Sequence, residues 1–216
     1  FDFDADRGNL TYVDAGRARV PTPQSAAAIN AAVALALHRR AGESRPAVVV
    51  VSDATSCRVT RIARAFGAEV IEVETGEINV VTAMQRAERR GQRAVVGVEG
   101  PSGGTIFAGT TCRDGTLVGA GALLASADRE LRAIIAGALA PGRAAALDAG
   151  LAGLVHLLPA QRSFTATERT AGDWHGTVSA IEQRWKAAFE AELAPVWRRF
   201  EIQYSHTSYV GPDRLA

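Results

Sequence analysis

Ala47-Val48-Val49-Val50-Val51 is a continuous run of small and β-branched residues. Such a run is typical of a strand that is buried on both faces of a parallel sheet. Similar runs follow at Val70–Val73 and Ala94–Val98, and apolar residues at helical spacing separate one run from the next. Strand, helix, strand, helix and strand with short connections predict an α/β fold with a mainly parallel sheet and right-handed crossovers.

Further elements are predicted on both sides of this core. Thr22-Pro23-Gln24 has a capping residue followed by proline at the first helical position, and Gly42 supplies the stop of that helix. The other segments are a short strand at Asn9–Val13, helices over Gly115–Leu124, Leu131–Leu139 and Ala144–Leu158, and a long helix over Val178–Phe200.

Three polar loops follow the three predicted strands. They are Asp53–Ser56, Thr75–Asn79 and Glu99–Thr105. In parallel α/β sheets, ligands bind outside the carboxyl ends of the strands, so these loops are expected to share one edge. This edge is the candidate site.

A separate cluster of charge lies at Asp2-Phe3-Asp4-Ala5-Asp6-Arg7. In a regular strand, alternate carboxylates would lie roughly 6–7 Å apart, which is too far for all three to share one ion. In a tight loop they can converge on a hard divalent cation, which prefers oxygen ligands. A solvated turn is the alternative reading, and the spacing alone leaves both open.

Two familiar sites are excluded by the pattern. An EF-hand loop counted from Asp2 would need glycine and glutamate where Arg7 and Val13 stand. No segment matches the glycine-rich phosphate loop G-x-x-x-x-G-K-[ST].

The composition predicts a cytoplasmic protein with one good-sized domain and parts of its neighbours. The 216 residues include 24 basic and 23 acidic side chains, which argues against a dedicated nucleic-acid binder. The two cysteines have no metal-ligand spacing, and no signal peptide or membrane span of ~20 apolar residues is evident. Because the chain starts with phenylalanine inside a charged motif, we expect it to be a fragment of a larger protein.

The order of these motifs resembles the α-D-phosphohexomutase superfamily of phosphoglucomutases and phosphomannomutases. Residues 2–7 are similar to its D-x-D-x-D-R metal loop, and residues 98–104 (Val-Glu-Gly-Pro-Ser-Gly-Gly) to its sugar-recognition loop. Arg113-Asp114-Gly115 matches the R-D-G/A that opens the next helix. Residues 75–81 (Thr-Gly-Glu-Ile-Asn-Val-Val) resemble the G-E-A-N-V-V stretch of one bacterial branch.

The resemblance implies a three-layer domain with helices on both faces of the sheet. Residues 1–20 would be the end of domain two, residues 21–165 domain three, and residues 166–216 a connector, a helix and the start of domain four. The family isomerises hexose phosphates by phosphoryl transfer through a phosphoserine on domain one, a sugar bisphosphate and Mg²⁺. Domains one and four of the same chain would then be partners, and this chain alone would be inactive and would bind Mg²⁺ poorly.

The resemblance also implies roles for individual residues. Three aspartates would ligate the metal, Arg7 would face the transferring phosphate, and the remaining residues would contact the sugar. The residues are Asp2, Asp4 and Asp6 for Mg²⁺, Arg7 for catalysis, and Glu99, Ser102, Gly103 and Gly104 for the phosphorylated hexose.

The sequence departs from the family pattern at two places. Many members have a histidine in the sugar loop, close to the place where Gly104 stands, and a lysine near Gly76, where Glu77 follows instead. The alternative interpretation is therefore a non-catalytic phosphosugar-binding or regulatory relative.

Overall fold

The computed structural model describes residues 2–142 and 150–160, with residues 183, 187 and 191. The chain divides into two compact units, residues 1–162 and residues 163–216, and the elements below belong to the first. They are β1 (Tyr12–Asp14), β2 (Arg17–Arg19), α1 (Pro23–Arg40), β3 (Ala47–Ser52), α2 (Cys57–Ala65), β4 (Glu69–Val73), α3 (Glu77–Arg89), β5 (Arg93–Glu99), the 3₁₀ turn η1 (Gly100–Ser102), β6 (Gly104–Phe107), α4 (Gly115–Ala127), α5 (Arg129–Leu139) and α6 (Gly150–Leu157).

The main sheet has the strand order β4-β3-β5-β6. Strands β4 and β5 pair in parallel with β3, whereas β6 runs antiparallel to β5. The mainly parallel sheet predicted from the valine runs is thus confirmed. Strand β6 was not predicted, because its four residues follow a glycine-rich turn that reads as a loop.

The two crossovers place their helices on opposite faces of the sheet. The chain moves from β3 to β4 on one side and then to β5 on the other side of β3. Right-handed connections in opposite directions put α2 on one face and α3 on the other. Alternate valines of β3 follow this division, since Val48 and Val50 pack with α3 while Val49 and Val51 pack with α1 and α2.

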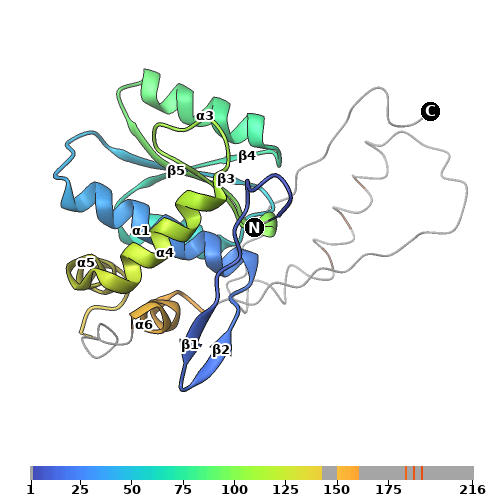
Figure 1. Ribbon diagram of the computed structural model, residues 1–216. Helices are drawn as coiled ribbons and strands as arrows, with labels where there is room; N and C mark the ends of the chain where they lie inside the picture. Colours follow the sequence, from blue (N-terminus) through green and yellow to red (C-terminus); the bar gives the residue numbers. More distant parts are fainter. Residues whose placement is uncertain (1, 143–149, 161–182, 184–186, 188–190, 192–216) are drawn as a thin grey trace, which may run out of the picture. The chain divides into compact units, whose positions relative to one another are not determined.

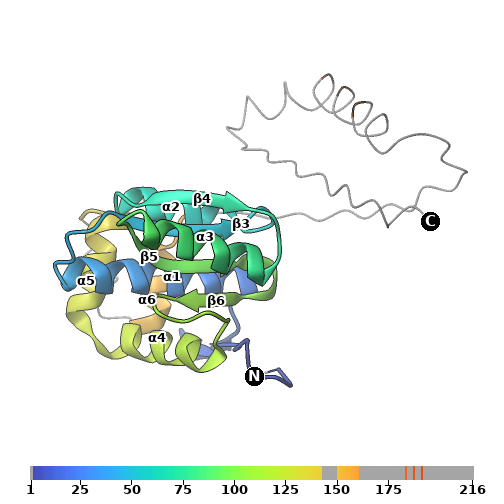
Figure 2. The ribbon, with the colours of Figure 1, turned by 90° about the horizontal axis from the view of Figure 1, so that it is seen from above.

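The layers are visible in Figure 1, where α3 lies above the sheet and α1 below it. Helix α1 packs between the sheet and a further group made of α4, α5 and α6. Figure 2, seen from above, shows the strands side by side with α1 running along them. This arrangement confirms the three-layer α/β fold. Across the described part of the chain, no helix is both long and apolar enough to cross a bilayer.

The helix ends agree with the capping residues in the sequence. Thr22 caps α1 by accepting the Ser25 backbone N–H over 3.2 Å, and Pro23 is the first helical residue. Helix α3 begins at Glu77, inside the segment Thr75–Asn79 that was predicted to be a loop. The predicted helix at 144–158 is described only as α6, and the predicted helix at 178–200 lies almost wholly outside the described residues.

The β1–β2 hairpin was predicted only in part, because the sequence analysis expected one strand here and not its partner β2. The expected strand at 9–13 is observed as β1 over Tyr12–Asp14, paired antiparallel with β2. The domain boundaries at residues 20 and 165 remain predictions.

Candidate functional site

Residues 2–7, called the acidic loop below, turn back instead of running as an extended strand. Ala5 adopts a left-handed backbone with φ of 58° at the middle of the turn. This turn gathers Asp2, Asp4 and Asp6, whose ligating oxygens lie within 4.8 Å of one another. The structure therefore brings together the three carboxylates that a regular strand would hold apart.

Arg7 is the counter-ion inside the acidic loop. Its Nε donates to Asp2 Oδ2 over 2.5 Å and to Asp6 Oδ1 over 3.2 Å, and its backbone N–H donates to Asp2 Oδ1 over 3.2 Å. Burial acts to raise the pKa of Asp2, but these hydrogen bonds from Arg7 outweigh it and hold that pKa below its ordinary value. The hydrogen bond to Asp2 in turn raises the pKa of Arg7. Arg7 thus faces carboxylates in this structure, and its predicted position beside a phosphate remains a prediction.

The acidic loop is seated on the first turn of α4. The Gly115 backbone N–H donates to the Ala5 carbonyl over 3.1 Å. A Cβ added at Gly115 would lie 2.7 Å from the Ala5 oxygen and 2.8 Å from the Arg7 carbonyl carbon, so only glycine permits this approach. The opposing Gly8 is equally close, because a Cβ there would lie 2.9 Å from the Gly115 oxygen.

Replacing Gly115 with alanine is expected to lift the acidic loop from α4. The added methyl group meets backbone atoms, which cannot rotate away, at a cost of about 1–3 kcal/mol. We expect trypsin to cleave the Arg7–Gly8 bond about tenfold faster in Gly115→Ala, measured by mass spectrometry, because local opening limits cleavage. Gly119→Ala in the same helix is the control, since a Cβ there meets nothing within 4 Å. Equal cleavage rates in both variants would contradict the proposal that close contact with Gly115 holds the acidic loop on α4.

Residues 99–104, called the Glu99 loop below, form a tight reversal between β5 and β6. Gly103 has φ of 72°, a left-handed conformation that favours glycine. Ser102 Oγ donates to the Glu99 carbonyl over 3.0 Å and accepts the Gly104 N–H at 3.3 Å. The Ser102 hydroxyl, which the sequence assigned to the sugar, therefore uses its proton inside the turn.

The Glu99 carboxylate is largely buried, with 6% of the residue exposed. Oε1 accepts the Gly76 backbone N–H over 3.0 Å, and Oε2 accepts from Arg113 Nη1 over 3.2 Å. A buried carboxylate needs such partners, because desolvation of an unpaired charge is costly. The two hydrogen bonds leave lone pairs on both oxygens for hydroxyl donors.

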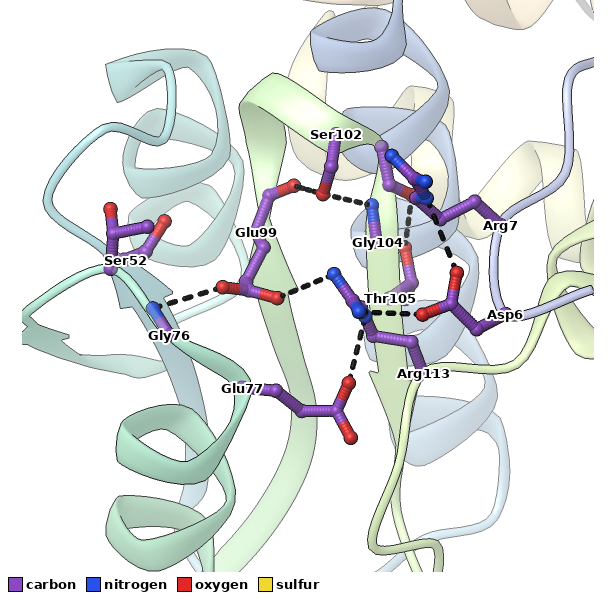
Figure 3. A network of polar contacts seen from close by, with 12 residues as sticks. Asp6, Arg7, Ser52, Gly76, Glu77, Glu99, Ser102, Gly104, Thr105 and Arg113 are labelled. Atoms are coloured by element: carbon purple, nitrogen blue, oxygen red, sulfur yellow. Dashed lines mark hydrogen bonds and ion pairs between the residues drawn. The ribbon is translucent and has the colours of Figure 1, made fainter. Parts of the chain in front are cut away.

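Arg113 joins the two loops, as Figure 3 shows. Its Nη2 lies 2.5 Å from Asp6 Oδ2, its Nη1 3.2 Å from Glu99 Oε2, and its Nε 2.7 Å from Glu77 Oε2. The Nε–Glu77 contact is an ion pair by distance, but its angle does not make a hydrogen bond. The sequence marked Arg113 only as the start of a helix motif. Its place one residue before the Asp114 cap, close in sequence to the Glu99 loop, was the available signal.

The first polar loop is tied to the Glu99 loop by Thr55. The Thr55 hydroxyl donates to the Val98 carbonyl over 3.1 Å and accepts the Gly100 N–H over 3.0 Å. The buried Ser52 hydroxyl lies 2.9 Å from it and completes the set as a donor. From β3 the chain first goes to β4 on one side and then to β5 on the other side, so the strand order reverses between β3 and β5. Ligands of α/β sheets bind at such a reversal, outside the carboxyl ends of the strands. The three polar loops thus share the predicted edge.

Comparison with models of known protein families matches residues 26–140 to the phosphoglucomutase/phosphomannomutase alpha/beta/alpha domain III. This match covers more than half of the chain. The chain belongs to this family. The resemblance seen in the motifs is confirmed at the level of the family and of the domain fold.

Among solved structures, this phosphohexomutase-family chain is similar to a phosphomannomutase-type protein. It is described as a putative phosphomannomutase from Thermus thermophilus, with 20% sequence identity and a TM-score of 0.39. The similarity covers 71% of this chain and 29% of that chain, so the present chain spans less than a third of its length. Comparison with curated protein sequences gave no significant match.

The donor set of this family member suits a hard divalent cation. Three carboxylates with oxygens up to 4.8 Å apart are slightly wider than the coordination shell of Mg²⁺, where oxygens lie about 2.9–4.2 Å apart. Arg7 and Arg113 already contact Asp2 and Asp6, and Asp4 is exposed. A cation would therefore share two of its carboxylates with arginines, and a small contraction of the loop would complete the fit.

Proposed function

We propose that this chain is part of a Mg²⁺-dependent phosphohexomutase that interconverts hexose 1-phosphate and hexose 6-phosphate. The supporting observation is the ion-paired connection from Asp6 through Arg113 to Glu99, which puts a candidate cation site and a candidate hydroxyl acceptor on one sheet edge. Family membership supports the reaction class. In this proposal a phosphoserine on domain one and a phosphate grip on domain four complete the enzyme, and the chain alone is inactive.

The acidic loop supplies the charges for phosphoryl transfer. Asp2, Asp4 and Asp6 would hold Mg²⁺, which when bound neutralises charge on the transferring phosphoryl group. Arg7 keeps its charge at all physiological pH values, and its planar fork has donors suited to phosphate oxygens. The seat on Gly115 fixes this loop relative to the Glu99 loop.

The Glu99 loop would position the hexose. The Glu99 carboxylate is held on both oxygens by N–H donors and accepts further hydrogen bonds from sugar hydroxyls. Gly103 and Gly104 are buried, and the space beside them is occupied by Pro23 and by the Arg113 stem, so their contact with the sugar remains a prediction. Ser102 contributes the rigidity of the turn and one acceptor oxygen, since its proton is directed to the Glu99 carbonyl.

A non-catalytic phosphosugar-binding protein is the second candidate. The observation that favours it is Glu77, whose carboxylate lies 2.7 Å from Arg113 Nε and adds negative charge where many family members have a lysine. The Glu99 loop also has glycine rather than histidine near Gly104. Turnover by the complete protein distinguishes the two candidates, because only the mutase changes hexose 6-phosphate into hexose 1-phosphate.

Sugar binding is tested by titrating the ¹⁵N-labelled chain with glucose 6-phosphate and mannose 6-phosphate in the presence of Mg²⁺. We expect NMR shift changes in the Glu99 loop and at Gly76, and an affinity loss of about tenfold or more in Glu99→Gln, since a hydrogen bond to a charged group contributes about 1.5–3 kcal/mol. Glu72→Gln, on the exposed side of β4, is the matched control and should bind like the wild type. Shift changes that avoid the Glu99 loop would contradict the proposed sugar site.

A further inference from the structure

Arg113 has an unusual set of partners for one side chain. Each of its three guanidinium nitrogens lies close to a different carboxylate, and each carboxylate comes from a different segment. Asp6 belongs to the acidic loop, Glu77 begins α3, and Glu99 ends β5. One positive charge is thus divided among three negative charges.

The sharing of Arg113 among three carboxylates matters because two of these carboxylates also belong to the proposed binding sites. On the proposed function, Asp6 is a metal ligand, and Glu99 contacts the sugar. Arg113 is the described side chain that pairs with both. Its side chain is 25% exposed and that of Glu99 is 8% exposed, so solvent screens these pairs less than it screens a surface salt bridge.

We propose that Arg113 is a positioning residue that couples occupancy of the cation site to the Glu99 loop. A divalent cation on the acidic loop draws the Asp6 carboxylate away from Arg113, which then pairs more fully with Glu77 and Glu99. Since coupling between two sites is reciprocal, a change at Glu99 must alter cation affinity through Arg113. This inference rests on the proposed function, because it uses the predicted cation site.

The geometry gives the sign of each effect. Arg113 competes with the cation for Asp6 Oδ2, so Arg113→Gln should tighten cation binding. Glu99→Gln leaves Arg113 one partner fewer, strengthens its pairing with Asp6 and should weaken cation binding. Arg113→Gln removes the side chain that connects Glu99 to Asp6. Adding Glu99→Gln to this variant should therefore change cation affinity much less than it does in the wild type.

The packing around Arg113 supports a fixed position for its side chain. A Cβ added at Gly104 would lie 2.4 Å from Arg113 Cδ, so the glycine leaves room for the arginine stem against β6. The Asp114 cap on α4 holds the adjacent backbone, with N–H donors from Thr116 and Leu117 at 2.8 and 3.0 Å. The Arg113 guanidinium therefore reaches the three carboxylates from a backbone position that is held by the capped first turn of α4.

The test is a titration of the full chain with Mn²⁺. Electron paramagnetic resonance is the readout, because it measures the concentration of free Mn²⁺ and so detects weak binding directly. The variants are Arg113→Gln, Glu99→Gln and the double variant, with thermal melting to verify folding. We expect about fivefold tighter binding in Arg113→Gln and about fivefold weaker binding in Glu99→Gln, at the lower end of typical couplings. The double variant should bind like Arg113→Gln.

Two control variants separate coupling from general electrostatics. Arg45→Gln removes an arginine with two carboxylate partners, Glu43 and Glu88, each at 2.8 Å, and should leave Mn²⁺ affinity unchanged. Glu74→Gln removes an exposed charge at the end of β4, near the same sheet edge, and should weaken binding less than Glu99→Gln does. If Arg113→Gln does not fold, the comparison of Glu99→Gln with Glu74→Gln still decides, since equal effects overturn the coupling.

The outcomes distinguish failure of the coupling from failure of the proposed function. Mn²⁺ binding that is lost in Asp4→Asn but unchanged or weakened in Arg113→Gln overturns the role of Arg113 and leaves the cation site standing. An equal effect of Glu99→Gln with and without Arg113 also overturns that role. Mn²⁺ binding that is insensitive to Asp4→Asn overturns the cation site, and the coupling with it.

Discussion

On the proposed function, Asp4→Asn is expected to reduce turnover of hexose phosphate by the complete protein by about 10³-fold, because a metal at the transferring phosphoryl group would contribute several kcal/mol. Asp4 is exposed, whereas Asp2 and Asp6 are held by arginines. The substitution thus removes one candidate ligand and leaves these ion pairs in place. A coupled assay for hexose 6-phosphate formation measures the change, with Mg²⁺ varied to separate weaker binding from slower chemistry.

Two further measurements make this result specific. The melting temperature of Asp4→Asn should match that of the wild type, since the aspartate is exposed. Glu72→Gln removes an exposed carboxylate from β4, far in the sequence from the acidic loop, and should keep full activity. Turnover by Asp4→Asn at the wild-type rate would contradict the assignment of Asp4 as a ligand of a metal that the proposed reaction needs.

Gly97→Ala is expected to destabilise the domain by about 3 kcal/mol, the upper end for overpacking of a core. Gly97 lies in β5, which pairs with a strand on each side. A Cβ there would lie 2.5 Å from Val80 Cγ1 and 2.6 Å from Met84 Sδ, both on α3. Met84 can adjust its flexible end, but the β-branched Val80 is fully buried and cannot, so α3 must move away from the sheet.

Thermal unfolding measures this effect, with a decrease of roughly 2–4 °C expected for each kcal/mol. Gly137→Ala in α5 is the matched control, because a Cβ there meets nothing within 4 Å. That variant should gain about 0.5–1 kcal/mol from the lower entropy of its unfolded chain. Opposite signs are therefore expected for the same chemical change, and destabilisation by both variants would mean that steric contact is not the cause.

The sheet was predictable from sequence because its two central strands, β3 and β5, are buried on both faces. Ala47–Val51 and Ala94–Val98 have no polar residue that would suggest another structure, and Gly67 and Gly91 mark the ends of the intervening helical segments. Strand β6 is different, since its pairing with β5 depends on the left-handed Gly103. Local pattern does not reveal a reversal that a single glycine makes possible.

The candidate site was predictable in its parts and not in its connections. Spacing alone left the acidic loop undecided between a cation site and a solvated turn. In the structure the three carboxylates converge, as a cation site requires, and their role as metal ligands stays a prediction. Ser102 was assigned to the sugar, but its hydroxyl also stabilises the turn. The role of Arg113 depends on contacts between segments about a hundred residues apart, which sequence periodicity does not encode.

The antiparallel pairing of β6 with β5 has a further consequence for catalysis. Glu99 pairs in register with Gly104, so both ends of the Glu99 loop belong to the same antiparallel strand pair. The loop is therefore a short hairpin and not a hinged lid. On the proposed function, the bisphosphate intermediate must present each end to the phosphoserine in turn. The stiffness of this hairpin implies that the sugar does the turning, and that the protein offers a stationary template to both of its orientations.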